Sequence, residues 1–376
     1  MDKVIVFAIP VFSILIAAEV VYGWKKKRNT YRLNDAISSL SQGVLSQLVA
    51  SVTQIFQIGF YTMIYSSVAV VRNDAWWNAW YGWILAVLCY DFCDYWLHRM
   101  SHESALLWAA HAVHHQSQDF NFSTALRQES AYMLLGWVFF VPMALLGVPP
   151  ENFAIAGLVV LLYQFWIHTE HVGKLGWFDR VFSSPSNHRV HHAVNPQYID
   201  KNYGAILVLW DRMFGTFSEE REKCAYGTLA PLNSWDPLWA IVGGYWKLAQ
   251  NAWHAPRWAD KLRIWYKPPG WQPDAVSQMP APTATDGAQA RRYDPPTSRA
   301  AKWCGGVQFL LLLAASGAYL WQAEQLPART AAILLFAITM GLWSVGAVLQ
   351  ARIRISTALL LDVVAVALGV WALGLF

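Results

Sequence analysis

Histidines dominate one stretch of this chain: ten of the eleven lie between His98 and His192, in the patterns HRMSH, HAVHH, HTEH and NHRVHH. Residues three or four apart share one face of a helix, so these patterns predict helices that each present several imidazoles to one side. A lone histidine is most simply a hydrogen-bonded residue near a helix end, but ten neutral imidazoles in one region are hard to satisfy with protein partners alone. The set therefore predicts a metal site. The candidate ligands are His98, His102, His111, His114, His115, His168, His171, His188, His191 and His192.

The composition is that of a membrane protein. Hydrophobic residues make up 56% of the 376 positions and charged residues only 14%, and the 22 tryptophans fit the aromatic belts of bilayer interfaces. We expect an all-α integral membrane protein built as a multi-span helical bundle. The net charge of +4 is modest and requires no nucleic-acid partner.

Several stretches are candidate membrane helices, because spanning a bilayer takes about 20 apolar residues. They are residues 4–24, 45–71, 80–97, 132–148, 153–167, 303–321, 330–349 and 357–376. The fourth and fifth are short, and residues 147–150 between them predict a tight hairpin, which leaves open whether the pair crosses fully or only in part. The first has no basic segment before it and no small-residue cleavage site after it, which favours a retained anchor over a signal peptide.

Basic residues predict the orientation. They concentrate at 25–28, 223–267, 299–302 and 352–354, and such residues favour the cytoplasmic side of a membrane. Counting spans from these positions places both ends of the chain outside. The same count places the histidine-rich site on the cytoplasmic side.

The sequence divides into four parts. We expect N-terminal anchor spans at 1–78, the histidine-bearing domain at 79–267, a linker rich in Pro and Ala at 268–299, and a three-span membrane region at 300–376. The last region contains no histidine, so it is expected to be structural.

The donor atoms narrow the chemistry. Imidazole suits zinc, copper, iron and nickel, and no cysteine lies within a histidine cluster. A structural zinc closes with four ligands, so this many imidazoles predict two metal ions with positions left open for a small molecule. The sequence has no recognisable NAD, flavin or haem motif, so a redox reaction would draw electrons from a separate reductant or protein.

A second set of polar residues is expected to support the ligands. Asp94 lies one helical turn before His98 and Asp91 two turns before it, and an acid within a span is costly without a function. We expect Asp94 to accept the free ring N–H of a ligand histidine. The alternative is an acid hydrated at the helix end. The weaker candidates for such a role are Glu103, Asn121 and Glu170.

Longer motifs around the histidines resemble a known family. HRMSHE, HAVHHQSQDFNFSTALRQ, LLYQFWIHTEH and SPSNHRVHHAVNPQYIDKNYG, followed by LWDRMFGTF, are similar to the fatty acid hydroxylase and sterol desaturase superfamily of membrane di-iron oxygenases. The resemblance implies that nine of the ten histidines, all except His171, are ligands of two iron ions. His171 lies three residues after His168 but is not a constant member of the motif. Asn187 stands at a position where a relative can carry a further histidine.

Within that superfamily, STALRQ, YQFWIHTE, IDKNYG and PPGWQP resemble a branch that acts on alkylglycerols. The resemblance implies O2-dependent hydroxylation of a lipid chain beside its ether oxygen, which yields a fatty aldehyde and a glycerol derivative. The implied partners are a lipid in the membrane, O2 and an external electron donor, either tetrahydrobiopterin or a redox protein. Four aromatic residues could stack on a pterin, although positions in the core or at the interface explain them more simply. They are Trp108, Phe120, Phe122 and Trp166.

Two other functions use parts of the same pattern. A site of this kind could act on a sterol, sphingolipid, fatty acid or carotenoid, as a hydroxylase or a desaturase. A membrane metal transporter or sensor would also use histidines, but it predicts them distributed through the bilayer. Here they gather at the ends of the expected spans, which favours the oxygenase.

Overall fold

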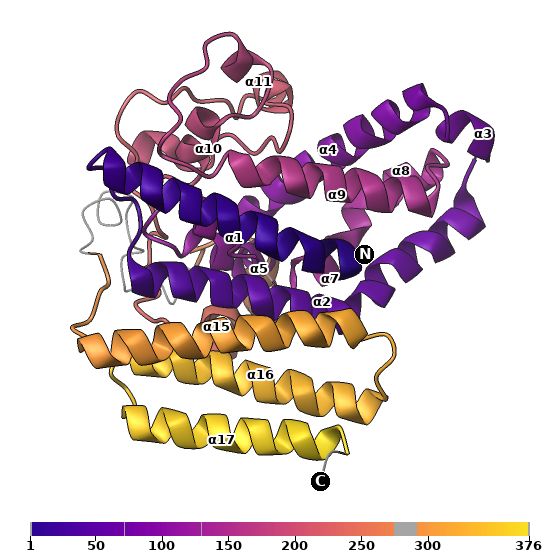
Figure 1. The fold of residues 1–376 in the computed structure, drawn as a ribbon. Coiled ribbons are helices and arrows are strands. Elements are labelled where there is room, and N and C mark those ends of the chain that lie inside the picture. The colour runs from indigo at the N-terminus through magenta and orange to yellow at the C-terminus, as the bar shows by residue number, and fades with distance from the viewer. Residues whose placement is uncertain (1, 71, 129, 274–291, 375–376) are drawn as a thin grey trace.

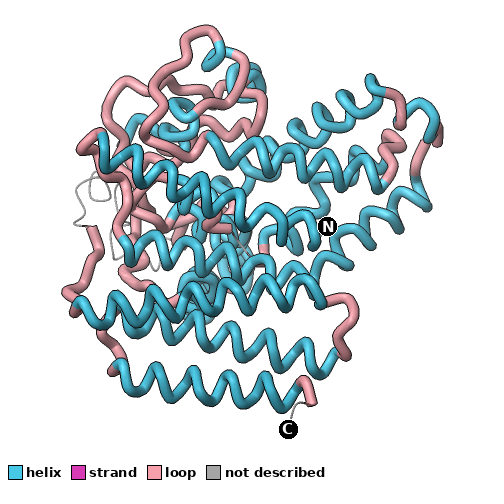
Figure 2. The backbone as a smooth tube through the Cα atoms, in the orientation of Figure 1, coloured by secondary structure: helices cyan, strands magenta, loops and turns pink. Residues whose placement is uncertain are grey.

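The computed structural model of the protein describes residues 2–70, 72–128, 130–273 and 292–374. Helices account for the regular structure in these ranges, and the extended segments form only isolated β-bridges, Phe182 with Leu207 and Ala193 with Tyr226 (Figure 2). The predicted all-α class is therefore confirmed. The helices are α1 (Asp2–Lys25), α2 (Leu33–Val68), α3 (Asp74–Trp77), α4 (Trp80–Glu103), α5 (Ala105–His115), α6 (Phe122–Ala125), α7 (Tyr132–Gly136), η1 (Trp137–Phe140), α8 (Val141–Leu145), α9 (Pro150–Trp166), η2 (Phe178–Arg180), α10 (Pro185–His191), η3 (Pro196–Tyr198), α11 (Leu209–Phe214), α12 (Pro237–His254), α13 (Trp258–Tyr266), α15 (Arg299–Gln322), α16 (Ala328–Leu349) and α17 (Ile355–Ala372).

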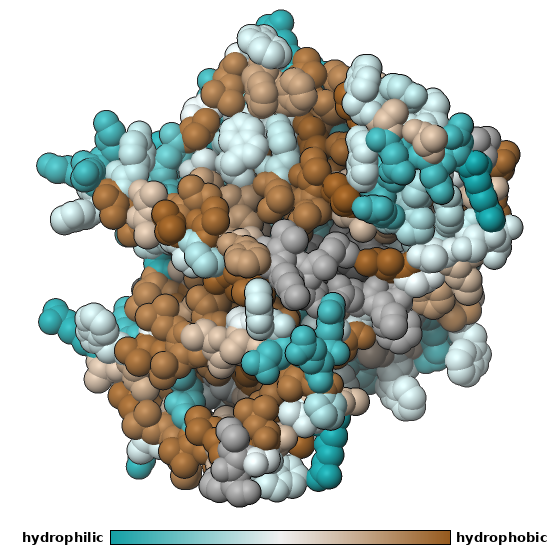
Figure 3. Space-filling model, turned by 45° about the vertical axis from the view of Figure 1, so that its right-hand side comes forward, coloured by the Kyte–Doolittle hydropathy of each residue, from teal (hydrophilic) through white to brown (hydrophobic). Residues whose placement is uncertain are grey.

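Four of these helices are long and apolar enough to cross a membrane: α1 from Val6 onward, α15, α16 and α17. A fifth candidate is α2, whose two parts, Leu33–Thr53 and Ile58–Val68, meet at 44°. Large apolar side chains on these helices face outward, among them Phe7 on α1 and Leu311 on α15. Figure 3 shows how widely apolar side chains cover the surface. These features confirm a multi-span helical bundle.

Three expected spans differ from the helices observed. Residues 80–97 belong to α4, which runs on to Glu103 and is not among the membrane candidates. Residues 153–167 fall in α9, whose 17 residues are about 25 Å long. Residues 132–148 form no single helix but the broken run α7, η1 and α8. The break coincides with Pro142 at the start of α8, because proline lacks the N–H that would continue an α-helix.

The C-terminal helices form a row. α15, α16 and α17 lie side by side, and each runs opposite to the one before (Figure 1). The N-terminus and C-terminus lie at one end of the row, whereas the α1–α2 and α16–α17 connections lie at the other (Figure 1). α2 packs against this row through a shared apolar core. Its buried members are Ile37, Leu45, Leu48, Trp235, Phe309, Tyr319, Leu320, Ile338, Leu342, Val345 and Leu349.

A second apolar core fixes α4. It joins one face of α4 to α8, α9 and the end of α2, and it includes Tyr61 stacked on Phe153 with ring centroids 4.0 Å apart. Cys93 and Leu97 of α4 are buried in it, five residues and one residue before His98. The core therefore sets the position at which α4 delivers its first histidine.

The last described part of the expected linker, residues 292–299, returns to the histidine-bearing part. Tyr293 donates its backbone N–H to Gln118 Oε1 at 2.7 Å, and Thr297 donates its hydroxyl to the Leu349 carbonyl at 2.8 Å. Most of the predicted linker, residues 274–291, lies outside the described residues. Its described ends therefore connect the row of C-terminal helices to the domain that precedes it.

Candidate metal centre

Nine of the ten predicted ligands converge into two groups. Within each group, the potential ligand nitrogens all lie within 4.8 Å of one another, a spacing that a single metal ion can bridge. Group A contains His98, His102, His111, His115 and His191, and group B contains His114, His168, His188 and His192. The arrangement is consistent with the two metal ions that the size of the histidine set predicts.

Helix geometry divides each HxxHH motif between the groups. Residues four apart on a helix differ by about 40° in direction, so His111 and His115 of α5 both reach group A. His114 diverges from its neighbour His115 by about 100° and reaches group B instead. α10 repeats this division in reverse, with His188 and His192 in group B and His191 in group A. The two motifs therefore interlock around two adjacent points.

The hydrogen bonds of group B require a cation. His114 Nδ1–H donates to the Arg127 carbonyl at 2.9 Å, and His168 Nδ1–H donates to the Gln164 carbonyl at 2.7 Å. A neutral imidazole has one N–H, so both Nε2 atoms carry lone pairs. These two Nε2 atoms lie 3.2 Å apart, and two acceptors cannot bond to each other. A positive ion between them resolves the conflict.

Group A has the same design. His98 Nδ1–H donates to the Tyr203 carbonyl at 2.8 Å, and His191 Nδ1–H donates to the Lys201 carbonyl at 3.0 Å. Their Nε2 lone pairs point at His111 and His115, with Nε2 to Nε2 distances of 3.0 and 3.1 Å. Backbone carbonyls thus fix the ring tautomers from outside and direct the free nitrogens inward.

Burial excludes a proton as that cation. All nine imidazoles are at most 8% exposed. Burial, reinforced in His168 by the neighbouring imidazole of His114, lowers the pKa of His168 well below its usual value, and burial lowers the pKa of His114 to about 4. The rings of His114 and His168 are therefore neutral near pH 7, as metal ligands must be. His102 Nε2 is buried without a hydrogen-bond partner among the described residues, which also fits a ligand atom.

Two buried carboxylates hold the loop that supports His98. Asp211 accepts the backbone N–H groups of Tyr203 and Gly204 at 2.7 and 2.8 Å. Asp91 accepts those of Ile206 and Leu207 at 2.7 and 3.1 Å, and also Trp210 Nε1–H at 2.8 Å. Asp91 therefore acts on the Tyr203 loop, and the Tyr203 carbonyl is the group that binds the ring of His98.

A buried arginine supports His114 from the other side. Arg127 is 2% exposed; its carbonyl accepts from His114, and its guanidinium donates to the Val113 carbonyl at 2.6 Å, to Ser38 Oγ at 3.1 Å and to Gln116 Oε1 at 2.8 Å. Burial lowers the pKa of Arg127 to about 10, which leaves it charged near pH 7. The residue ties α2 and α5 to one ligand of group B.

Glu19 connects the first membrane helix to the same group. This acid of α1 is 6% exposed and accepts hydrogen bonds from the hydroxyls of Tyr31 and Thr169 and, at 2.9 Å, from the backbone N–H of Phe122. Thr169 directly follows His168. The sequence offered one signal for Glu19, a single acid within a long apolar stretch, and such acids usually have a function.

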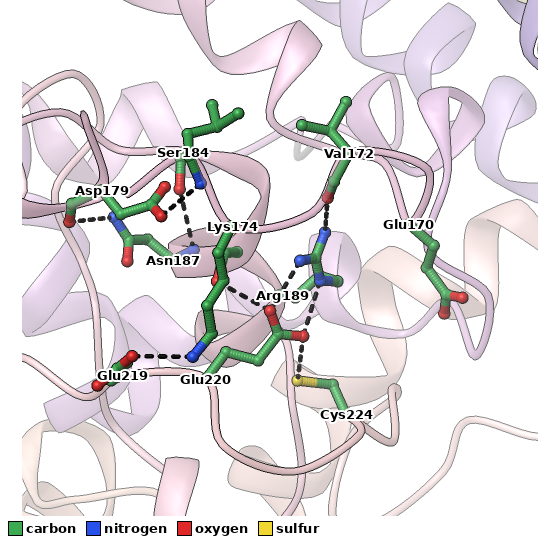
Figure 4. Close-up of polar contacts among 12 residues, drawn as sticks. Glu170, Val172, Lys174, Asp179, Ser184, Asn187, Arg189, Glu219, Glu220 and Cys224 are labelled. Atoms are coloured by element: carbon green, nitrogen blue, oxygen red, sulfur yellow. Dashed lines mark hydrogen bonds and ion pairs between the residues drawn. The ribbon is translucent and has the colours of Figure 1, made fainter. Parts of the chain in front are cut away.

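An ion pair and several hydrogen bonds fix α10 and the loop before it. Arg189 forms a two-point ion pair with Glu220, at 2.8 and 2.7 Å, and donates to the carbonyls of Thr169 and Val172 at 2.9 and 2.7 Å (Figure 4). The Ser184 hydroxyl caps the N-terminus of α10. Arg189 thereby joins the loop after His168 to the helix that carries His188 and His191.

Asn187 belongs to this framework. Its Nδ2 donates to the carbonyls of Asp179 and Phe182 at 3.0 and 3.2 Å (Figure 4). Its own carbonyl accepts from Asn202 Nδ2 at 3.0 Å. The side chain that occupies this position therefore binds the backbone rather than joining either histidine group.

The remaining predicted residues lie away from the ligand nitrogens. His171 is in neither group; its Nε2 lies 3.4 Å from Thr30 Oγ1.

Glu103 pairs with Arg99 at 2.8 Å and Glu170 with Arg28 at 3.3 Å. Asn121 caps α6 and donates to the Thr30 carbonyl at 2.7 Å. Asp94 is half-buried on α4; it was expected to accept the ring N–H of a ligand histidine, but that of His98, one turn later, is bound to the Tyr203 carbonyl. Asp200 was not anticipated, and its Oδ1 lies 3.5 Å from His102 Nδ1.

Aromatic rings wall the two groups. Trp108 packs on His102 with ring centroids 4.9 Å apart, and Phe120 stacks on His168 at 5.4 Å. Tyr203 packs on His102 at 5.2 Å. The other two aromatic candidates lie further out: Phe122 stacks on Phe165, and Trp166 packs on Tyr163. The rings of Trp108 and Tyr203 thus pack against group A, and the ring of Phe120 packs against group B.

Comparisons with known proteins agree with this geometry. The pattern of the fatty acid hydroxylase family matches residues 83–216, which include all ten clustered histidines. Alkylglycerol monooxygenase of Xenopus tropicalis is 38% identical over 304 residues, 81% of this chain and 68% of the relative. The enzyme of the same name from Danio rerio is 37% identical over 352 residues, 92% and 77% of the two chains. Ornithine lipid hydroxylase of Rhizobium tropici is 28% identical over 203 residues, which are 51% of this chain and 59% of that protein. No solved structure matches the chain.

The fold and the histidine centre are those of a membrane-bound oxidoreductase that acts on lipids. The chain belongs to the fatty acid hydroxylase family and, within it, to the group of the alkylglycerol monooxygenases. The sequence-based assignment to this family is confirmed.

The structure separates two histidines that lie three residues apart. We expect His168→Ala to lose metal and activity, because His168 Nε2 lies 3.0 Å from His188 Nε2 in group B. We expect His171→Ala to keep its metal content and most of its activity, because its ring contacts Thr30 instead. Metal analysis and turnover of the two purified variants test this, and equal loss in both would contradict the division.

Replacing Glu19 tests its support of His168. Three donors converge on this carboxylate, so Glu19→Gln places an N–H₂ group opposite at least one donor and should cost about 1–3 kcal/mol. We expect a lower midpoint of thermal unfolding and weaker metal retention. Glu324→Gln is the matched control, because Glu324 is exposed. A Glu19→Gln variant that equals the control in both measurements would refute the role.

Proposed function

We propose that the chain is a di-iron monooxygenase that cleaves the ether bond of alkylglycerols. The observation that carries the proposal is the pair of buried groups made only of imidazoles, whose potential ligand nitrogens lie within 4.8 Å of one another in each group. Nitrogen donors of this kind suit iron. The names of the two similar enzymes from Xenopus tropicalis and Danio rerio support the choice of substrate.

The two groups would hold one iron ion each, and the irons would activate O2 for insertion into a C–H bond. The reaction consumes the lipid, O2, two electrons and two protons. One oxygen atom enters the chain carbon beside the ether oxygen, and the other leaves as water. The hemiacetal product then breaks into a fatty aldehyde and a glycerol derivative.

The residues of this chain would control that chemistry by position. The carbonyls of Tyr203 and Arg127 hold His98 and His114 in the tautomer that binds metal. The rings of Trp108 and Phe120 keep water away from the ligands. Group B has four histidines and group A has five, so an ion in group B would retain more free positions. We therefore assign ligand roles to these nine histidines and a positioning role to Asp91, Asp211, Arg127 and Glu19.

The domain limits and the orientation are part of the proposal. We place the catalytic domain at 79–267, between the anchor spans 1–78 and the linker 268–299, with the three-span region 300–376 after it. The basic runs favour a cytoplasmic active site. Electrons would come from tetrahydrobiopterin or from a redox protein on that side, since the sequence carries no motif for NAD, flavin or haem.

The test of the substrate is direct. Membranes that contain the protein are incubated with an alkylglycerol, tetrahydrobiopterin and O2, and fatty aldehyde is measured. We expect aldehyde from the wild-type chain and none from His115→Ala, which removes a group A nitrogen. Hydroxylation of a sterol or fatty acid with no aldehyde from the alkylglycerol would replace this substrate with one of its rivals.

Reporter fusions test the orientation. Both termini lie at the same end of the helix row, opposite to the connections that carry the basic runs (Figure 1). We expect reporters at the N-terminus and at the C-terminus to report a non-cytoplasmic location, and one within residues 350–354 to report a cytoplasmic one. Termini on opposite sides of the membrane would contradict this arrangement.

A further inference from the structure

Two amphipathic helices, α12 and α13, present an unusual outer surface, which we call the aromatic face. Its large apolar residues recur at helical spacing, so they lie along one side of each helix. They are Trp239, Val242, Trp246 and Trp253 on α12, and Trp258, Leu262 and Tyr266 on α13. Trp253 is 79% exposed and Trp258 is 81% exposed, so these side chains cover no part of the described protein core. Such a patch marks a contact with something else.

The composition of the aromatic face fits the edge of a lipid bilayer. Five of its seven residues are tryptophan or tyrosine, the side chains that concentrate where headgroups meet acyl chains. The same two helices and their flanks carry the basic residues Lys247, Arg257, Lys261, Arg263 and Lys267. The acid among them, Asp260, is buried and paired with Arg263 at 3.2 Å. The resulting positive charge is complementary to anionic headgroups.

The start of α12 is attached to the end of a candidate membrane span. Asp236 caps α12, and it also accepts Trp343 Nε1–H of α16 at 3.1 Å. Ser234 donates its hydroxyl to Gln350 Oε1 at 3.2 Å, directly after the last residue of α16. Because α16 is long and apolar enough to cross the bilayer, its end marks the bilayer edge. α12 therefore begins at that edge.

The inner side of α12 and α13 rests on the metal-binding helix. Gln116 Nε2 donates to the Ala240 carbonyl of α12 at 3.0 Å, and Ala105 donates its backbone N–H to the Lys267 carbonyl at 2.9 Å. A Cβ on Gly244 would lie 3.2 Å from Ala109, so α12 and α5 are in close contact. α5 carries His111, His114 and His115, so the aromatic face and the metal centre lie on opposite sides of a single helix layer.

We propose that α12 and α13 lie in the plane of the bilayer interface, with the aromatic face inserted among anionic phospholipids. The arrangement holds α5 and its three ligands at the depth of the headgroups. A lipid with a polar headgroup presents the first carbons of its chain at that depth. This last consequence rests on the proposed function, whereas the insertion itself does not.

The test measures the environment of the aromatic face in the full-length protein. Trp258→Cys and Leu262→Cys variants are labelled with the fluorophore NBD and placed in nanodiscs of phosphatidylcholine and phosphatidylserine. Arg221→Cys, at an exposed position in a charged loop, is the labelled control, and the parent chain corrects for its own four cysteines. Quenching is measured with brominated lipid chains and with iodide in the water.

We expect blue-shifted emission at 258 and 262, strong quenching by brominated lipid and protection from iodide, with the reverse at 221. We also expect brominated phosphatidylserine to quench more than brominated phosphatidylcholine, a difference that Arg257→Gln combined with Lys267→Gln should remove. Quenching by iodide at 258 and 262 would show a water-facing surface and overturn the proposal. Quenching by neither agent would show a surface covered by protein and would also overturn it. Neither readout depends on activity, so failure of the proposed function is detected separately by the aldehyde assay.

Discussion

The repulsion between unprotonated imidazole nitrogens is the constraint on which the rest of this structure depends. Lone pairs of His114 and His168 face each other at 3.2 Å, and burial prevents a proton from separating them. In the other group, the Nε2 lone pairs of His98 and His191 point at the rings of His111 and His115, at 3.0 and 3.1 Å. A cation at each of the two points would remove this repulsion, so we expect metal binding and folding of this region to be coupled.

The surrounding protein prevents the rings from escaping that constraint. Each Nδ1–H that is bound to a backbone carbonyl fixes the direction of its ring, and the carbonyls are in turn held by buried charged residues. Asp91 and Asp211 fix the loop of Tyr203, and Arg127 fixes the loop that binds His114. Glu19 extends this support to the first membrane helix. The polar groups inside the apolar bundle are thus concentrated where they orient ligands.

Sequence patterns predict the parts of this design that depend on local geometry. The helical class, the long apolar spans and the presentation of imidazoles from helix faces all follow from spacings of three, four and about twenty residues. The division of the histidines into two groups does not, because it depends on how α4, α5 and α10 meet. Residues 132–148 were expected to form one helix and form a broken run instead. The cause is local and visible in the sequence, namely Pro142. The partner of His98 could not be predicted, because Asp94 is near in sequence whereas Tyr203 is brought close only by the fold.

The metal content of the purified, active protein tests the central claim most directly. Two histidine groups in one chain predict two metal ions per chain, and the all-nitrogen donor set together with the proposed oxygenase chemistry predicts that both are iron. Elemental analysis alongside a Mössbauer spectrum would give the number and identity of the ions. Two irons per chain would support the account, and active protein with a single zinc ion and no iron would contradict it.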